Sequence, residues 1–357
     1  MRLRGPLVSA TLSATLIITM LFAAVGCQEI YEIDEEPLTR TEFLMDTVIK
    51  LNIYDRKDEG IMDKAVDRLK EIEEGMSATI PTSDVNLINE NAGIKPVKVR
   101  EDVYQVIQEA KNFAIATDGA YDPTIGPLVE LWDIASKNRE EADSIPTDEE
   151  IQKAKDLVDY NDLELRDGGY VYLKRPGMKI DLGGIAKGYA ADEVKDIFVE
   201  EGVKSAIIDL GGDIYALGNK GKGRPWRIGI EDPFEKAGSY LGVSNVENKS
   251  IVTSGDYKRF FIYKGNKYHH IIDPSTGYPT DNEISSISII SDRSIDGDAL
   301  ATALFILGVD KGSEIISDLE DVEAIFITKK GEVIIDEKAM KKFSLESDKL
   351  KLVKNSR

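Results

Sequence analysis

The order of apolar and polar residues predicts a chain that contains both helices and strands. Residues Thr47–Tyr54 alternate between apolar and polar, which is typical of a strand with one buried face. Ile61–Glu74 and Glu101–Ala116 carry apolar residues at helical spacing and charged residues on the opposite side, which predicts two amphipathic helices. Thr147 and Glu150 form a capping-box pattern that predicts the start of a further helix.

From Tyr170 onward, short apolar runs predominate. We expect strands at Val171–Lys174, Lys179–Leu182, Ser205–Leu210, Trp226–Ile230, Ser250–Thr253, Arg259–Lys264, Tyr268–Ile272, Ile284–Ile290, Ala324–Thr328 and Glu332–Ile335. Helices are expected after Asp181, after Asp298 and over Lys311–Leu319. Strands joined by tight turns with few helices between them favour an α+β fold with mixed or antiparallel sheets over a doubly wound parallel sheet.

The N-terminal segment predicts export and attachment to a membrane. Arg2 and Arg4 precede an apolar run that ends in Ala24-Val25-Gly26-Cys27, a pattern similar to a bacterial lipoprotein signal. We therefore expect residues 1–26 to be a signal peptide, residues 27–40 a polar tether from a lipidated Cys27, and residues 41–350 a single domain. An uncleaved transmembrane anchor is the alternative. Both place the domain on the extracytoplasmic face of a bacterial cell membrane.

The charge of the chain excludes one class of partner. Lys and Arg number 45 against 65 Asp and Glu, which gives a formal net charge of −20. Loss of residues 1–26 would remove two positive charges and no negative ones, so the mature chain would be more acidic still. Such a surface repels nucleic acid, and no nucleic-acid partner is expected.

His269 and His270 are the only histidines, and they stand directly before an Asp-Pro-Ser-Thr-Gly turn. Imidazole titrates near pH ~6.5, so a histidine at the edge of a pocket is a candidate base. The alternative is two structural histidines beside a strand. We assign the inward position to His270 and the outward one to His269, which we expect to be dispensable.

Two further segments could bind phosphate and a metal ion. Asp181-Leu182-Gly183-Gly184 predicts a glycine turn before a helix, whose free N–H groups favour a phosphate, with Lys187 adding a positive charge. Asp298 and Thr302 are four residues apart on a predicted helix and share one face, and their hard oxygen atoms suit Mg²⁺. The alternatives are a structural glycine turn and a helix with no ligand.

A third segment, Thr117 to Leu128, is a loop rich in Gly and Pro, where Tyr121 could either cover an aromatic ligand or anchor the loop. The chain has no Gly-x-Ser-x-Gly elbow and no His-Glu-x-x-His motif. Cys27 is its only cysteine, so a cysteine nucleophile in the globular part is excluded.

These motifs together resemble the ApbE family of FAD:protein FMN transferases, which has a T-fold-like architecture. The resemblance runs in order through Phe43–Thr47, Gly119–Trp132, Asp181–Ala190, Asp209–Asp213, Trp226–Pro233, Thr253–Tyr257, His270–Pro279 and Asp298–Gly308. It implies transfer of FMN from FAD to a Thr or Ser hydroxyl of an acceptor flavoprotein through a phosphoester bond, with release of AMP. The acceptor would be a membrane redox subunit or an extracellular electron carrier.

The resemblance also implies roles for individual residues. His270 would be the base, and Mg²⁺ would be held by Gly184, Asp298, Ala301 and Thr302. FAD would contact Met45, Thr79, Ala120, Tyr121, Asp122, Asp181, Lys187 and Ile272. Many members carry an aromatic residue where this chain has Thr79, and the position of Lys187 varies between cationic and acidic residues. Two other functions fit the same residues, namely an FAD pyrophosphatase that yields FMN and AMP and a flavin-binding lipoprotein without catalysis.

Overall fold

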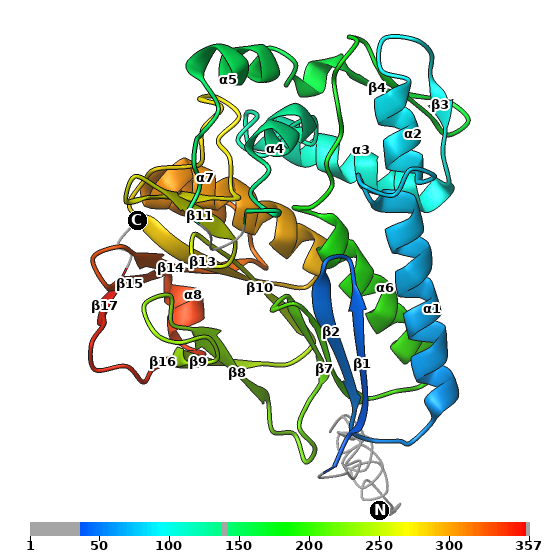
Figure 1. Ribbon diagram of the computed structural model, residues 1–357. Coiled ribbons are helices and arrows are strands. Elements are labelled where there is room, and N and C mark those ends of the chain that lie inside the picture. The colour runs from blue at the N-terminus through cyan, green and yellow to red at the C-terminus, as the bar shows by residue number, and fades with distance from the viewer. Residues whose placement is uncertain (1–35, 138–140, 355–357) are drawn as a thin grey trace, which may run out of the picture.

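The computed structural model describes residues 36–137 and 141–354. The predicted signal peptide, Cys27 and the tether up to residue 35 lie outside the described residues. Within the described part, no helix is long and apolar enough to cross a membrane. Its helices and strands form one mixed α+β structure built around a large sheet (Figure 1). The predicted fold class is confirmed.

A twisted sheet of nine strands forms the centre of the part of the chain that the structure describes. In spatial order the strands are β1 (Leu38–Leu44), β2 (Thr47–Ile53), β6 (Ser205–Leu210), β7 (Ile214–Gly218), β10 (Lys249–Gly255), β13 (Ile284–Ser291), β14 (Glu323–Thr328), β15 (Glu332–Ile335) and β17 (Lys351–Lys354). The pairs from β1 to β15 are antiparallel, and β17 joins β15 in parallel. Sequential strands therefore mostly pair with each other through short turns, as the sequence pattern predicts.

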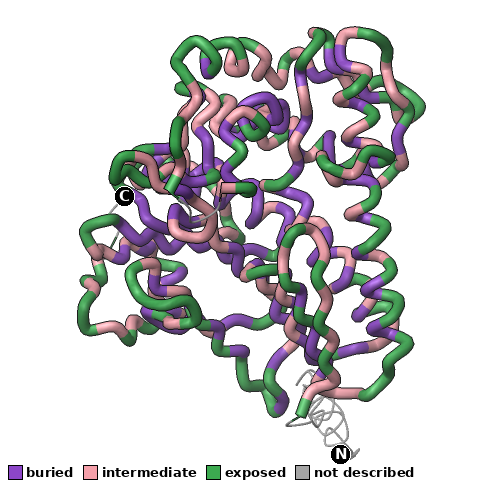
Figure 2. Tube along the Cα trace, in the orientation of Figure 1, coloured by how far each residue is buried: buried purple, intermediate pink, exposed green. Residues whose placement is uncertain are grey.

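Both faces of this sheet are covered. Helices α6 (Ala186–Glu200) and α7 (Ser294–Ser317) lie on one face, and α1 (Glu59–Met76) packs on α6 (Figure 1). The other face packs on a small sheet of β8 (Trp226–Glu231), β9 (Tyr240–Val246) and β16 (Phe343–Leu345), and on the short helix α8 (Glu337–Met340), which precedes β16. The main strands and α7 are therefore largely buried, while the outer surface of α1 is exposed (Figure 2).

A smaller helical part lies above α6 and α7 in Figure 1. It consists of α2 (Asp84–Glu90), α3 (Glu101–Ala116), α4 (Gly126–Trp132), α5 (Asp148–Lys155), η1 (Tyr160–Asp162) and a sheet of β3 (Val97–Lys98), β5 (Tyr170–Leu173) and β4 (Leu163–Arg166). The hairpin of β11 (Phe260–Tyr263) and β12 (Asn266–His269) packs on α4, where Trp132 stacks on Tyr268 at 5.5 Å between ring centroids. This packing brings the histidine segment to the helical part.

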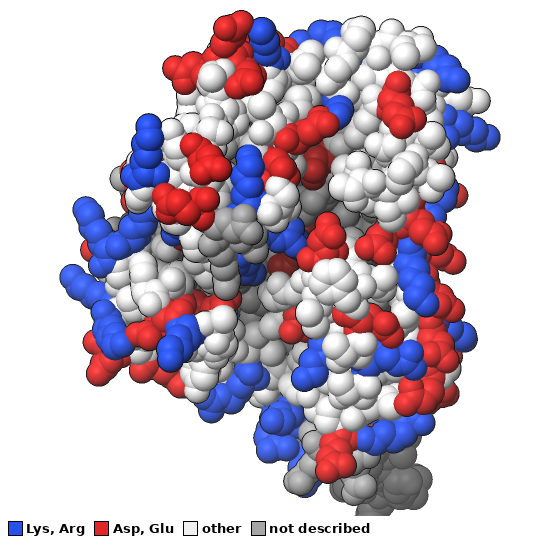
Figure 3. All heavy atoms as spheres, viewed as in Figure 1, with Lys and Arg blue, Asp and Glu red and all other residues white. Residues whose placement is uncertain are grey.

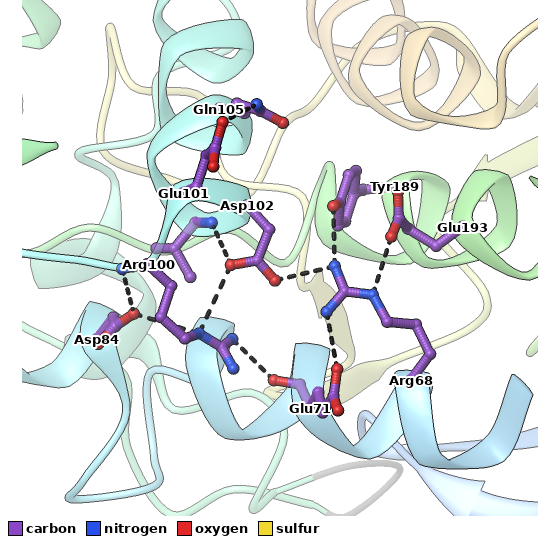
Figure 4. A network of polar contacts seen from close by, with 10 residues as sticks. Arg68, Glu71, Asp84, Arg100, Glu101, Asp102, Gln105, Tyr189 and Glu193 are labelled. Atoms are coloured by element: carbon purple, nitrogen blue, oxygen red, sulfur yellow. Dashed lines mark hydrogen bonds and ion pairs between the residues drawn. The ribbon is translucent and has the colours of Figure 1, made fainter. Parts of the chain in front are cut away.

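A polar network ties α1, α3 and α6 together (Figure 4). Arg68 of α1 donates hydrogen bonds to Glu193 and to the Tyr189 hydroxyl of α6, at 2.8 and 3.0 Å, and to Asp102 of α3 at 2.9 Å. Glu71 of α1 accepts a further hydrogen bond at 3.1 Å, so one guanidinium group, whose side chain is only 20% exposed, joins four partners. The network holds the helix that carries Lys187 in place.

The structure corrects several boundaries. Strand β1 begins at Leu38, so the last residues of the predicted 27–40 tether belong to the sheet, and β17 extends the domain beyond residue 350. The predicted strand at Lys179–Leu182 was wrong, since Lys179 makes only an isolated bridge to Ile125. Its apolar residues are buried because the segment crosses the core, which alternation alone does not distinguish from a strand.

The two helices predicted after Asp298 and over Lys311–Leu319 are present as the two parts of α7, which the non-helical residue Gly308 separates. Gly308 has φ 82°, and side chains satisfy the backbone groups that the interruption frees. Asn282 donates to the carbonyl oxygen of Phe305 at 2.6 Å, and Glu283 accepts from the Val309 N–H at 2.8 Å. The chain therefore forms two helix segments with a kink between them.

Candidate active site

The first turns of α6 and α7 meet and cap each other. A carboxylate oxygen of Asp298 in α7 accepts the Gly188 N–H of α6 at 3.0 Å. In return, Asp192 of α6 accepts the N–H groups of Ser294 and Ile295 at the start of α7, both at 3.0 Å. A Cβ atom on Gly188 would lie 2.4 Å from the Ser294 carbonyl oxygen, so only glycine allows this close crossing.

Lys187 lies between two buried carboxylates at this crossing. Its Nζ atom is 3.1 Å from Asp298 Oδ1 and 2.8 Å from Asp213 Oδ2, and Asp213 belongs to the turn between β6 and β7. Burial disfavours the ammonium form, but the two carboxylates outweigh it and raise the pKa of Lys187 above its ordinary value. Burial raises the pKa of Asp298, although Lys187 opposes the shift. Two carboxylates and one ammonium leave this cluster with a surplus negative charge.

Gly184, Thr302 and Tyr121 complete this cluster. A Cβ atom added to Gly184 would lie 3.1 Å from Thr302 Oγ1 and 3.2 Å from a ring carbon of Tyr121, so these two side chains contact the Gly184 backbone closely. The Tyr121 hydroxyl is buried and has no hydrogen-bond partner among the described residues. Burial, followed by the charges of Asp298, Asp181 and Asp122, raises its pKa well above the ordinary value. An unpartnered hydroxyl group beside carboxylates is poised to donate a hydrogen bond to a ligand that enters this site.

The donor atoms of this cluster fit Mg²⁺. Asp298 supplies a carboxylate, Thr302 a hydroxyl one helical turn further on, and the backbone passes close by at Gly184. Among the described residues, no three His, Cys, Asp or Glu side chains gather into a metal site. A cation here would therefore use hydroxyl and backbone oxygen atoms together with those of a phosphate. Ala301, the fourth predicted ligand, is fully buried on the same helix, and only its backbone could contribute.

The two histidines face opposite to the prediction. His269 is buried, with Nε2 2.8 Å from the Thr280 carbonyl oxygen and Nδ1 accepting the Ile271 N–H at 3.3 Å. The prediction that His269 points outward was wrong, because the last residue of β12 turns into the core beside Phe305. His270 is exposed, yet protein atoms surround its ring closely enough to lower its pKa by desolvation. A side chain that is exposed and yet closely surrounded in this way is typical of the wall of a hollow.

Figure 3 shows such a hollow just above the β1–β2 hairpin, with acidic and basic atoms in its depth. The hairpin turn consists of Met45 and Asp46, which both have positive φ angles. Arg259 donates to the Asp46 carbonyl oxygen at 2.8 Å, and its own carbonyl oxygen accepts the His270 N–H at 3.1 Å. Arg259 therefore holds the turn that carries Met45 and the backbone of the histidine segment together.

The remaining predicted residues play more local roles in the structure. The Asp122 carboxylate is occupied by Thr124 and by the Tyr160 N–H, at 2.7 to 3.1 Å, so it fixes its own loop. Asp181 accepts the Gly183 N–H at 2.7 Å, and burial raises its pKa. Within the described part of the chain, no hydrogen bond or ion pair joins three other predicted positions to the Asp298 cluster. These are the buried Ile272, the half-buried Ala120 and the exposed Thr79, which bonds to Ser77.

Asp213 and Arg259 are site residues that the sequence analysis did not assign. A signal for Asp213 was present, since Ile208-Asp209-Leu210-Gly211-Gly212 repeats the segment Ile180–Gly184 and runs directly into it. The two copies differ in structure. Gly211 and Gly212 have positive φ angles in a hairpin turn, whereas Gly183 and Gly184 lead into α6 without them. Two surface cavities, of about 330 and 510 Å³, lie beside Asp232 and Ser313, at other residues than this cluster.

Comparison with known proteins gives a consistent family. Residues 45–326 match the family model of the ApbE family. An FAD:protein FMN transferase of Klebsiella pneumoniae is 38% identical over 312 residues, which covers 87% of this chain and 95% of that relative. One of Treponema pallidum is 34% identical over 307 residues, with 81% and 84% coverage.

Solved structures agree with these relatives. The ApbE protein of Thermotoga maritima superposes with a TM-score of 0.77 at 32% identity, covering 85% of this chain and 98% of that structure. The flavin transferase ApbE of Vibrio cholerae gives a TM-score of 0.73 at 27% identity, with 82% and 94% coverage. On sequence and structure together, this chain belongs to the ApbE family.

Proposed function

We propose that this protein transfers the FMN part of FAD to a Thr or Ser hydroxyl group of an acceptor protein and releases AMP. The observation that carries the proposal is the convergence of Asp298, Thr302, Gly184, Lys187 and Tyr121 at the start of α6, in a chain whose curated relatives are named FAD:protein FMN transferases. A pyrophosphate is doubly negative, and displacement at its phosphorus gains most from positioning and charge neutralisation.

Mg²⁺ would be held by Asp298, Thr302 and the backbone at Gly184 and Ala301, where it would neutralise charge on the pyrophosphate oxygen atoms. Lys187 would add a second positive charge beside them. The positive end of the α6 helix dipole favours an anion at the same place. Together these groups would offset the repulsion between an acidic protein and an anionic substrate.

His270 would act as the base that accepts the proton of the acceptor hydroxyl. Its Nδ1 atom lies 3.3 Å from the Arg259 carbonyl oxygen. When Nδ1 carries the proton and donates to that oxygen, Nε2 keeps a free lone pair that can accept the hydroxyl proton. In the reaction the hydroxyl oxygen bonds to the FMN phosphorus, the bond from that phosphorus to the bridging oxygen breaks, and AMP leaves with the bonding electrons.

The N-terminal sequence supports a location for this reaction. We propose that lipid on Cys27 anchors the protein on the outer side of the cytoplasmic membrane, where the acceptor would be a membrane redox subunit or an extracellular electron carrier. Replacement of Cys27 by Ala should move the protein from the membrane pellet to the soluble fraction after cell breakage. Retention of Cys27→Ala in the pellet under high salt would contradict the lipid anchor.

The transfer itself is tested with membranes from a strain of the source bacterium that lacks this protein. Purified protein, FAD and Mg²⁺ are added, and covalent flavin is detected by its fluorescence in a denaturing gel. The proposal predicts a fluorescent protein band that requires Mg²⁺ and is absent with Asp298→Ala. Release of FMN and AMP without any fluorescent band would instead favour the pyrophosphatase, and FAD that stays intact would favour a binding protein.

A further inference from the structure

Asp213 has no assigned role, although it is one of the most deeply buried carboxylates beside the proposed metal site. It is 2% exposed, and Asp298 is 3% exposed. Its Oδ2 atom is closer to Lys187 Nζ, at 2.8 Å, than either oxygen of Asp298, at 3.1 and 3.2 Å. A buried carboxylate requires a compensating partner, and the partner of Asp213 is the same ammonium group that pairs with Asp298.

This shared ammonium group creates a conflict for metal binding. A divalent cation bound to Asp298 and the Lys187 ammonium group would both contact the same carboxylate. Two positive charges at such a distance repel strongly inside a protein. Asp298 also keeps the Gly188 N–H, so its position at the start of α6 is fixed and it cannot turn away from Lys187. Lys187 must therefore be the group that yields. Its side chain is 26% exposed and long enough to swing, whereas Asp298 is held by the Gly188 N–H and the Asp213 side chain is buried.

We infer that Asp213 is a positioning residue that retains the Lys187 ammonium group when a divalent cation takes over Asp298. With Asp213 present, Lys187 leaves Asp298 without losing its counter-ion and stays beside the substrate phosphate. Without Asp213, Asp298 is the only carboxylate within reach, and Lys187 then competes with the cation for it. This inference rests on the proposed metal site of the FMN transferase and adds to it a residue outside its ligands.

Calorimetric titration of Mg²⁺ into the FAD-free, full-length protein tests the inference without relying on catalysis. Asp213→Asn should raise the Kd for Mg²⁺ about tenfold, a coupling of ordinary size between neighbouring sites. Lys187→Met should lower the Kd, because the competitor is gone. In the Lys187→Met background, Asp213→Asn should then have little effect. Asp209→Asn is the matched control, since Asp209 lies at the end of β6, next to the same turn, and carries the same charge but accepts the Gly212 N–H.

Two results would overturn the inference. One is an unchanged Kd in Asp213→Asn when the circular dichroism spectrum shows that the variant is folded. The other is an equal rise in Kd with and without Lys187, or an equal rise in Asp209→Asn, since either would show a general loss of negative charge. Absence of Mg²⁺ binding by the wild-type protein would remove the metal site itself, and FMN transfer by the same sample would show whether the proposed function falls with it.

Discussion

His270 lies beside Arg259, which holds the β1–β2 turn, and the contact of its Nδ1 atom with the Arg259 carbonyl oxygen decides what its other nitrogen can do. We predict that His270→Ala lowers kcat for FMN transfer by ~10²–10⁴-fold, the usual contribution of a positioned base. FAD affinity, measured by equilibrium dialysis, should stay within a factor of about two, because the base acts on the acceptor hydroxyl. Loss of FAD binding together with activity would assign His270 to the flavin instead.

The surroundings of His270 also predict a pH dependence. Desolvation, followed by the positive charges of His269, Arg259 and Lys258, lowers the pKa of His270. A lowered pKa keeps the imidazole in its neutral, proton-accepting form as the pH falls. The value of kcat/KM should therefore stay level from pH 8 to pH 6, whereas an ordinary pKa near ~6.5 would already reduce it there. In Arg259→Gln the acidic fall should move to higher pH; a fall centred near pH 6.5 in the wild-type protein contradicts the shift.

For the adjacent His269 we predict the opposite, a role in stability. Its ring bridges the Thr280 carbonyl oxygen and the Ile271 N–H inside the core. His269→Ala leaves both groups buried without partners and opens a cavity, so the free energy of unfolding in urea should fall by about 2–4 kcal/mol. His270→Ala is the matched control and should change it by less than about 0.5 kcal/mol. Equal stability of the two variants would contradict the assignment.

At the scale of elements, the crossing of α6 and α7 depends on carboxylates that cap the opposite helix. Asp192 caps α7 from within α6. Asp192→Ala should lower the free energy of unfolding by about 1–3 kcal/mol, because two buried N–H groups lose their acceptor. Asp196→Ala, one turn further along the same helix at an exposed position, should have little effect. Similar losses in both variants would mean that helix propensity, and not capping, decides the stability.

Elements with a clear periodicity were predictable from the sequence. The helix at Glu101–Ala116 and the strand at Ser205–Leu210 have the predicted limits; the helix buries one face and exposes the other, and the strand is a short apolar run with no exposed residue. The capping box of Thr147 and Glu150 is also confirmed. The two helices of α7 were predicted separately, but the groups that hold the break at Gly308, Asn282 and Glu283, come from a loop distant in sequence and were not. Local pattern carries no information about such partners.

Across the whole molecule, the site residues that stand in a local sequence pattern could be predicted, whereas those defined by contacts between distant segments were missed. Asp298, Thr302, Gly184 and Lys187 could be proposed because each stands in a local pattern of its own, and the structure brings them together. Asp213 could not be assigned, because its contact with Lys187 requires the β6–β7 turn to fold over the start of α6. The prediction of which histidine points inward was wrong for a related reason. Alternation predicts that two neighbours point apart, but the tertiary packing decides which one is inside.

The proposed roles of Asp298, Lys187 and His270 all depend on one reaction, in which this protein joins FMN covalently to a hydroxyl group of another protein. The most direct measurement is mass spectrometry of the flavin-bearing acceptor after reaction with FAD and Mg²⁺, with AMP quantified in the same sample. We predict an FMN phosphoester on a Thr or Ser side chain of the acceptor and one AMP per modified acceptor. The Asp298→Ala variant should produce neither the phosphoester nor AMP. AMP released together with free FMN while every acceptor keeps its original mass would contradict it.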